Sequence, residues 1–302
     1  MILRNYINFI NNSKYIYKNI EIRLKDIILF YKINKKKNND SDNKIREIII
    51  DSIFNKKTPE IYFKKSQRWL NIKKELEKFV KKLSKNEEIK KIECIQKAGR
   101  KYNYDYDLKI NNKIFKIEFK YNTSSIKDVP QFVSPGKPSK YLSNNFEEFY
   151  YDNYLSKSKI KTKYEIDIPE REIYLKEVHN IAPKCMKKIK EKYKEDKEFC
   201  NYMTELYNNS TKEFIEKYDL NLDVLNEYLK ESQKNKIYML YKKNKIYMEE
   251  NDVDNYILVS YIKEPNLKRY KAETKSGKKI NILIRWKNGK GIAYPAFQIS
   301  TS

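Results

Sequence analysis

Apolar and polar positions alternate from residue 115 to residue 121 within a strand-like segment over 113–121, a pattern typical of a β-strand with one buried face. The apolar side carries aromatic and aliphatic residues, namely Phe115, Ile117, Phe119 and Tyr121. The opposite side carries charged residues, namely Lys116, Glu118 and Lys120. Two further strand patterns precede this one at 89–96 and 104–110, and Asn111-Asn112 lies between the last two as a tight turn would. The sequence therefore predicts three consecutive strands, of which the last two form a hairpin.

Upstream of these strands the apolar spacing is that of helices. Residues 1–57 predict a helical arm, with helix-like spacing over 20–33 and a second short helix over 44–54. Thr58-Pro59-Glu60 is a helix-start signal, and the helix that follows extends to Ser84 with or without a break. One face of that helix is apolar along its length and carries Trp69, Ile72, Leu76, Phe79, Val80 and Leu83.

Downstream the pattern changes twice. Residues 122–145 are loop-like, 146–155 predict a helix, and 169–233 are mostly helical and highly charged. From residue 236 the period is two, which predicts a hairpin and then four further strands. We therefore expect an α/β protein with four segments: a helical arm over 1–60, a core over 61–165, a helical segment over 166–235, and a β region over 236–302. This last region either extends the core sheet or forms its own subdomain.

Charge and histidine content restrict the function. The 302 residues include 65 Lys and Arg against 41 Asp and Glu, a formal net charge of +24. A/T-rich coding inflates lysine, but a surface of this charge attracts polyanions whatever its origin. Nucleic acid, foremost double-stranded DNA, is the expected partner. The single histidine argues against histidine-based triads and histidine-metal centres. The basic residues expected to contact phosphates are Lys187 and Lys188 in the helical segment, and Arg285 and Lys287 in the β region.

Cysteine usage and hydropathy indicate the compartment. Cys94, Cys185 and Cys200 are few, widely spaced and contain no CxxC pair, so reduced thiols are expected. The N-terminal residues do not resemble a signal peptide, and no apolar run is long enough for a membrane span. These features predict an intracellular protein of a reducing compartment, cytoplasm or nucleus, without a membrane partner; the oligomeric state stays open.

The predicted hairpin brings carboxylates together on its polar face. A two-residue turn pairs Asp105 with Glu118 and Asp107 with Lys116, whereas a four-residue turn pairs Asp107 with Glu118. In either register both aspartates share the face of Glu118 and Lys120. Opposed carboxylates repel each other unless a cation lies between them, and oxygen ligands favour Mg²⁺ or Mn²⁺. A lysine beside such a cation can orient a water molecule and offset negative charge at phosphorus.

This arrangement resembles the PD-(D/E)XK, or restriction-endonuclease-like, nuclease superfamily. The resemblance covers about residues 64–135 and rests on Asp107, then Glu118-Phe119-Lys120, after a helix that ends near Ser84. The proline that often precedes the family's aspartate is replaced here by Tyr106. This segment and the tail 285–300 also resemble hypothetical nucleases of large DNA viruses with A/T-rich genomes.

The resemblance implies a restriction-endonuclease-like core, in which a mixed sheet is flanked by helices, and a magnesium-dependent endonuclease acting on DNA. It implies that Asp107, Glu118 and the Phe119 carbonyl hold the metal, with Asp105 as the alternative ligand, and that Lys120 positions the attacking water. Gln131 is a candidate for the family's downstream glutamine, and Glu75 for the glutamate of its first helix.

Other interpretations of the same residues stay open. The motif E-x-K also occurs at Glu88/Lys90, Glu195/Lys197 and Glu273/Lys275, so the tripeptide alone carries little information in a lysine-rich chain. The polar strand face is compatible with a solvated surface that carries incidental ion pairs. Two further functions are a non-catalytic nucleic-acid-binding protein, such as a packaging or virion component, and an RNA-directed nuclease on the same fold.

Overall fold

The chain folds into two compact units, and each unit is formed by two separate segments of the sequence. The structure, a computed structural model, describes residues 13–31, 39–97, 102–126, 133–250 and 252–301. Unit 1 comprises residues 1–129 and 234–251, and unit 2 comprises 130–233 and 252–302. These boundaries differ from the four consecutive segments expected from the sequence. The difference arises because the strands after residue 236 divide between the units: two join the sheet of unit 1 and four form a separate sheet in unit 2.

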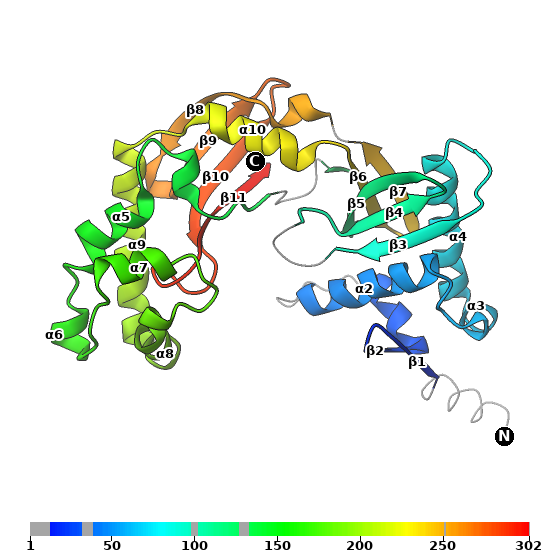
Figure 1. The fold of residues 1–302 in the computed structure, drawn as a ribbon, viewed down its shortest axis with the longest axis horizontal. Coiled ribbons are helices and arrows are strands. Elements are labelled where there is room, and N and C mark those ends of the chain that lie inside the picture. The colour runs from blue at the N-terminus through cyan, green and yellow to red at the C-terminus, as the bar shows by residue number, and fades with distance from the viewer. Residues whose placement is uncertain (1–12, 32–38, 98–101, 127–132, 251, 302) are drawn as a thin grey trace. The chain divides into compact units, whose positions relative to one another are not determined.

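Unit 1 is built around a five-stranded sheet in the order β3-β4-β5-β6-β7. All neighbouring strands are antiparallel except β5 and β6, which are parallel because the chain forms much of unit 2 between them. The helices of the unit are α2 (Asn39–Phe54), α3 (Glu60–Lys65) and α4 (Gln67–Leu83), preceded by a short 3₁₀-helix over Leu24–Phe30. The sheet strands are β3 (Ile92–Gln96), β4 (Tyr106–Ile110), β5 (Lys113–Tyr121), β6 (Lys236–Lys242) and β7 (Lys245–Glu250) (Figure 1).

The core of unit 1 lies between this sheet and its helices. Burial alternates along β4, where Tyr106, Leu108 and Ile110 are buried and the residues between them are half-exposed. These side chains share one apolar cluster with the buried residues of α2 and α4. The apolar face predicted for the helix before Ser84 is confirmed, since its six members are the buried residues of α4, namely Trp69, Ile72, Leu76, Phe79, Val80 and Leu83. Burial of each large side chain contributes about 1.5–3 kcal/mol. One face of the sheet thus packs against the helices, and the charged side chains of β5 lie on the opposite face.

Only the second half of the helical arm expected from the sequence is confirmed: the short helix expected over 44–54 lies within α2, whereas the described residues before it, 13–31, are not α-helical. Strands β1 (Lys14–Tyr17) and β2 (Ile20–Arg23) form a two-stranded hairpin before the 3₁₀-helix. The two turn residues, Lys18 and Asn19, both have positive φ, at 49° and 62°, as a primed hairpin turn requires. The helix start at 58–60 is confirmed, but Pro59 occupies the N-cap position of α3, whereas the Thr58 hydroxyl bonds Ser52.

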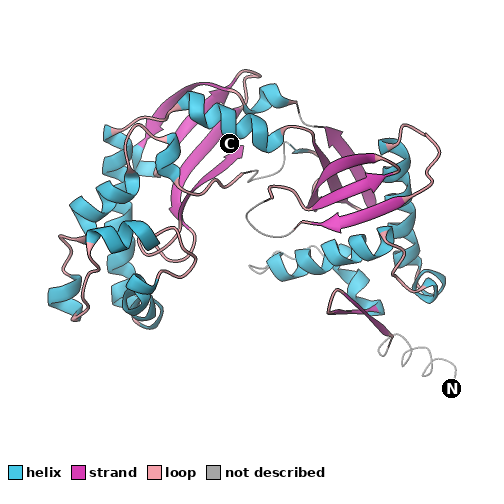
Figure 2. Ribbon diagram, viewed as in Figure 1, coloured by secondary structure: helices cyan, strands magenta, loops and turns pink. Residues whose placement is uncertain are grey.

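Unit 2 combines a helical layer with a four-stranded antiparallel sheet in the order β11-β10-β9-β8 (Figure 2). Short 3₁₀ and π turns connect several of its elements. Its helices are α5 (Phe146–Tyr150), α6 (Ile160–Tyr164), α7 (Arg171–Glu177), α8 (Lys187–Glu195), α9 (Lys197–Lys217) and α10 (Leu222–Gln233). Its strands are β8 (Leu258–Glu264), β9 (Arg269–Thr274), β10 (Lys279–Trp286) and β11 (Pro295–Thr301).

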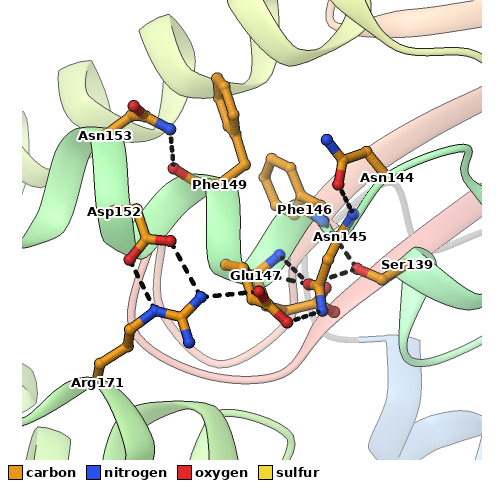
Figure 3. Close-up of polar contacts among 10 residues, drawn as sticks. Ser139, Asn144, Asn145, Phe146, Glu147, Phe149, Asp152, Asn153 and Arg171 are labelled. Carbon is orange, nitrogen blue, oxygen red and sulfur yellow. Dashed lines mark hydrogen bonds and ion pairs between the residues drawn. The ribbon is translucent and has the colours of Figure 1, made fainter.

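A polar network fixes the start of α5 in unit 2. The Asn145 side chain caps the helix by accepting from the backbone N–H groups of Glu147 and Glu148, both at 3.1 Å (Figure 3). Arg171, from the first turn of α7, bridges Asp152 and Glu148, which ties α7 to the segment that begins with α5. Glu147 lies on the buried side of α5, and its side chain is only 3% exposed.

The fold class is confirmed as mixed α/β, with the helices and the five-stranded mixed sheet described above. Among the described residues, no helix is both long and apolar enough to cross a membrane. The three cysteines are unpaired: Cys94 is buried, and Cys185 and Cys200 are half-buried.

Candidate active site on the polar face of the five-stranded sheet

The turn between β4 and β5 decides which carboxylates meet. Ile110 pairs with Lys113 and Tyr106 with Ile117, which is the register of the two-residue turn. Asp105 lies one residue beyond the last pair of this register, and its carboxylate reaches β5 next to Glu118 through the backbone N–H of Phe119. The alternative pairing of Asp107 with Glu118 is therefore wrong, because it needs a four-residue turn, and Asp107 lies opposite Lys116 instead.

Asp105 is held by backbone contacts beyond the end of β4. Its N–H donates to the Ile117 carbonyl at 2.9 Å, one residue out of the register that pairs Tyr106 with Ile117. Its Oδ2 accepts from the backbone N–H of Phe119 at 2.7 Å, so the carboxylate is fixed against the strand that carries Glu118. Two contacts with the backbone of β5 therefore hold Asp105 in place, although it lies outside the regular strand pairing.

Glu118 lies between two ammonium groups. Its side chain is 10% exposed, and its Oε1 accepts a short hydrogen bond from Nζ of Lys120, two residues along the same face of β5. Its Oε2 lies 3.7 Å from Nζ of Lys236, which begins the parallel strand β6. One carboxylate is thus paired with two cations, which compensates for its burial.

The electrostatics of the cluster show that like charges converge there. Burial raises the pKa of Asp105 well above its usual value, and the negative charges of Glu118 and Glu47 add to the shift. For Lys120, burial lowers the pKa, but the carboxylates of Glu118, Asp105 and Glu47 outweigh burial, and the net pKa is raised. Titratable groups with pKa values perturbed by burial and by neighbouring charges, as for Asp105 and Lys120, are typical of functional sites.

Glu47 of α2 and Lys236 of β6 are members of this cluster that the sequence did not predict. The backbone carbonyl of Glu47 accepts from the Tyr106 hydroxyl at 3.0 Å, and its Oε2 accepts from Gln96 at 3.3 Å. Burial raises the pKa of Glu47, and the charge of Glu118 raises it further. A glutamate from a preceding helix was expected, but Glu75 was the candidate. The sequence pattern that points to Glu47 is its position in the helix predicted over 44–54, which precedes the three predicted strands.

The other predicted site residues lie elsewhere or outside the description. Asp107 forms an ion pair with Lys97 at 2.8 Å, one residue pair away from Glu118 on the same face. Glu75 of α4 accepts from the backbone N–H of Ile246 at 3.1 Å, beside the edge strand β7, and takes no part in the cluster among its described contacts. Gln131 lies outside the described residues.

The predicted phosphate contacts belong to unit 2. Lys187 and Lys188 are exposed in the first turn of α8, and Arg285 and Lys287 are exposed on either side of the buried Trp286. All four side chains reach solvent, as a phosphate contact requires.

The donor chemistry of the cluster fits a hard divalent cation. Among the described residues, no three His, Cys, Asp or Glu side chains are arranged to hold a metal ion. Magnesium does not need such a cage, because it is commonly bound through one or two carboxylates, with water and substrate phosphates as its remaining ligands. Asp105 and Glu118 supply two carboxylates on β5 and beside it, and the negative charges of Glu118 and Glu47 act on Asp105. These two residues, with the Phe119 carbonyl, are the donors that fit.

No protein-family model, curated protein or solved structure matches this chain. The interpretation of the site therefore depends on its own geometry.

Proposed function

We propose that this protein is a Mg²⁺- or Mn²⁺-dependent nuclease that hydrolyses phosphodiester bonds of DNA, acting as an endonuclease. The observation that carries the proposal is that the Asp105 carboxylate is held on the backbone of β5 beside Glu118, with the Lys120 ammonium on the Glu118 carboxylate. A solvated sheet face does not account for it, because the Glu118 side chain is almost buried and the charge of Glu118 adds to the effect of burial in raising the pKa of Asp105.

The arrangement of unit 1 supports a restriction-endonuclease-like core. Helices α2 and α4 precede three consecutive antiparallel strands, β3, β4 and β5, as in the superfamily pattern of a helix followed by three strands. Glu118 and Lys120 lie on β5, the third of these strands, and Asp105 lies immediately before the first residue of β4, the second. In this assignment Asp105 takes the role first given to Asp107, and Glu47 takes the role first given to Glu75.

The roles of the side chains follow from their contacts. Asp105, Glu118 and the Phe119 carbonyl would hold the cation, which supplies charge to stabilise the phosphorane-like transition state. Lys120 is protonated, because the surrounding carboxylates raise its pKa. A protonated lysine donates hydrogen bonds, so Lys120 orients the attacking water and offsets charge at phosphorus, and it does not serve as the general base.

The test is a supercoiled-plasmid nicking assay with Mg²⁺ or Mn²⁺, against EDTA, on the wild type and the double variant Glu118→Ala/Lys120→Ala. The chain offers a matched control, since Glu88 and Lys90 form the same E-x-K motif in unit 1 on an exposed segment, with side chains 81% and 76% exposed. We expect cation-dependent nicking by the wild type and by Glu88→Ala/Lys90→Ala, and at least about a hundredfold loss in the Glu118/Lys120 variant.

Nicking that resists EDTA, or that both double variants retain equally, would contradict the proposed site. A closed circular plasmid has no ends, so conversion to the nicked form also establishes endonucleolytic action. Substrate competition between duplex DNA and RNA of the same sequence distinguishes the DNase from an RNA-directed nuclease on this fold.

The second candidate function is nucleic-acid binding without chemistry. It is favoured by the net charge of +24 and by the lack of a three-ligand metal group among the described residues. It predicts salt-sensitive binding of DNA by wild type and variants alike, with no cleavage under any cation.

A further inference from the structure

We propose that Lys236, on strand β6, is a positioning residue that fixes the orientation and charge of Glu118. The inference rests on the proposed nuclease function and extends its site to a strand outside the recognised motif. Lys236 Nζ lies 3.7 Å from Glu118 Oε2, and its side chain is only 2% exposed. Among the described residues this Nζ has no hydrogen-bond partner.

The parallel register aims Lys236 at the site. Lys236 pairs with Lys116, and Tyr238 pairs with Glu118, so Lys236 shares the polar face of β5. The nearest aromatic group is the ring of Tyr238, whose centroid lies 5.7 Å from Nζ. A buried ammonium group without hydrogen bonds is costly, and a structural lysine would be expected to reach solvent. Its burial beside a carboxylate indicates that the charge itself is what the site uses.

The charges around Glu118 show what Lys236 does. Asp105, Glu118 and Glu47 contribute three negative charges when ionised, and Lys120 and Lys236 contribute two positive charges when protonated. Burial lowers the pKa of Lys236, and the carboxylates of Glu118 and Asp105 act against that shift. Lys236 engages Oε2 while Lys120 engages Oε1, so the plane of the carboxylate is set from two sides. Lys236 therefore moderates the negative charge that an incoming cation meets and prevents Glu118 from turning away from it.

This role predicts opposite effects on cation binding and on turnover. Lys236→Met removes the charge and keeps a similar side-chain length, so Mn²⁺ should bind about tenfold more tightly, because a repelling charge a few ångströms away is lost. Nicking at saturating Mn²⁺ should fall at least about tenfold, because Glu118 is then held by Lys120 alone. Lys236→Arg keeps the charge, and its Mn²⁺ affinity should stay within about twofold of wild type.

The experiment titrates Mn²⁺ calorimetrically into the full chain and measures nicking of the same preparations, with melting temperatures as the folding check. Lys245→Met, at the exposed start of strand β7, is the matched control and should change neither Mn²⁺ affinity nor nicking.

Tighter Mn²⁺ binding with slower nicking in Lys236→Met supports the proposal. Weaker binding and slower nicking to the same degree in the Met and Arg variants would indicate mere structural damage and overturn it. Unchanged binding and nicking in Lys236→Met would also overturn it. A wild type that neither binds Mn²⁺ nor nicks DNA would overturn the nuclease itself, and the role of Lys236 with it.

Discussion

Asp105 and Asp107 differ by two positions on one strand face, and their contacts separate their roles. Asp105 accepts from the Phe119 backbone and faces Glu118, whereas Asp107 is neutralised by Lys97 at 2.8 Å. A carboxylate that already has a dedicated lysine gains less from a metal ion than one that faces other carboxylates. The residue that holds the cation is therefore Asp105 in our proposal.

The same substitution, of aspartate by asparagine, at each of the two positions tests which aspartate holds the cation. Asp105→Asn should reduce cation-dependent nicking at least about a hundredfold, whereas Asp107→Asn should change it by no more than about threefold. Without cation, Asp105→Asn should melt at the same temperature as wild type or higher, because burial already disfavours the charged form of Asp105. Loss of nicking in Asp107→Asn alone would assign the metal to Asp107 and contradict the present arrangement.

At the scale of elements, local patterns predicted strands better than they predicted the N-terminal region. Strand β5 has the predicted bounds because alternation over the seven residues 115–121 has no helical interpretation. The hairpin of β1 and β2 was mistaken for helix because four-residue strands are too short to show a period. The charged face of β5 was predictable from alternation, and the two-residue turn predicted the register over Tyr106–Ile110 but not the out-of-register contact of Asp105.

The remaining members of the site come from other elements. Glu47 lies on α2 and Lys236 on β6, both distant in sequence from the hairpin. Their approach depends on how α2 packs beside the sheet and on the parallel pairing of β6 with β5, which no local pattern reports. Tertiary packing therefore completes a site whose centre is set by one turn.

In unit 2, the contact between α5 and the end of α7 predicts a pH dependence of stability. Glu147 Oε1 of α5 lies 3.3 Å from Nε2 of His179, just past α7; the Glu147 side chain is buried and that of His179 is half-buried. Burial raises the pKa of Glu147 to about 7 and lowers the pKa of His179 to about 4. Between about pH 4.5 and 7 the folded state holds a proton on Glu147 that the unfolded state has lost, so this residue destabilises the fold as the pH rises. His179 acts oppositely, because between about pH 4 and 6.5 only the unfolded state holds its proton.

The two contributions nearly cancel in the wild type and separate in single variants. Relative to Glu147→Gln, the free energy of unfolding of wild type should fall by about 3 kcal/mol as the pH rises from 4.5 to 7. Relative to His179→Asn, it should rise over pH 4 to 6.5. Each unit contains one of the two tryptophans, so urea unfolding followed by Trp286 fluorescence in a Trp69→Phe background reports on unit 2. Parallel pH curves for wild type and both variants would show that neither group titrates as described.

At the scale of the whole molecule, the two units interleave in sequence. The sheet of unit 1 is completed by β6 and β7, which follow the helices of unit 2 along the chain. The proposed site therefore uses residues from both segments of unit 1, while the exposed lysines of α8 belong to unit 2. A net charge of +24 distributed over such a chain favours binding of a polyanion by many weak phosphate contacts.

Salt dependence measures how many of these contacts form. With EDTA present to prevent cleavage, we expect the logarithm of the association constant for a DNA duplex to fall with the logarithm of salt concentration, with a slope of roughly −4 or steeper. Lys187→Gln/Lys188→Gln on α8 should make that slope shallower by about two, since each lost phosphate contact contributes about 0.9. The control, Lys161→Gln/Lys163→Gln, removes the same charge from α6 and should leave the slope unchanged. Its lysines are paired with carboxylates at 3.2 Å and 2.5 Å, whereas Lys187 lies 4.0 Å from Glu191. Equal slopes for the two double variants would remove α8 from the interface, and binding insensitive to salt would contradict a nucleic-acid partner altogether.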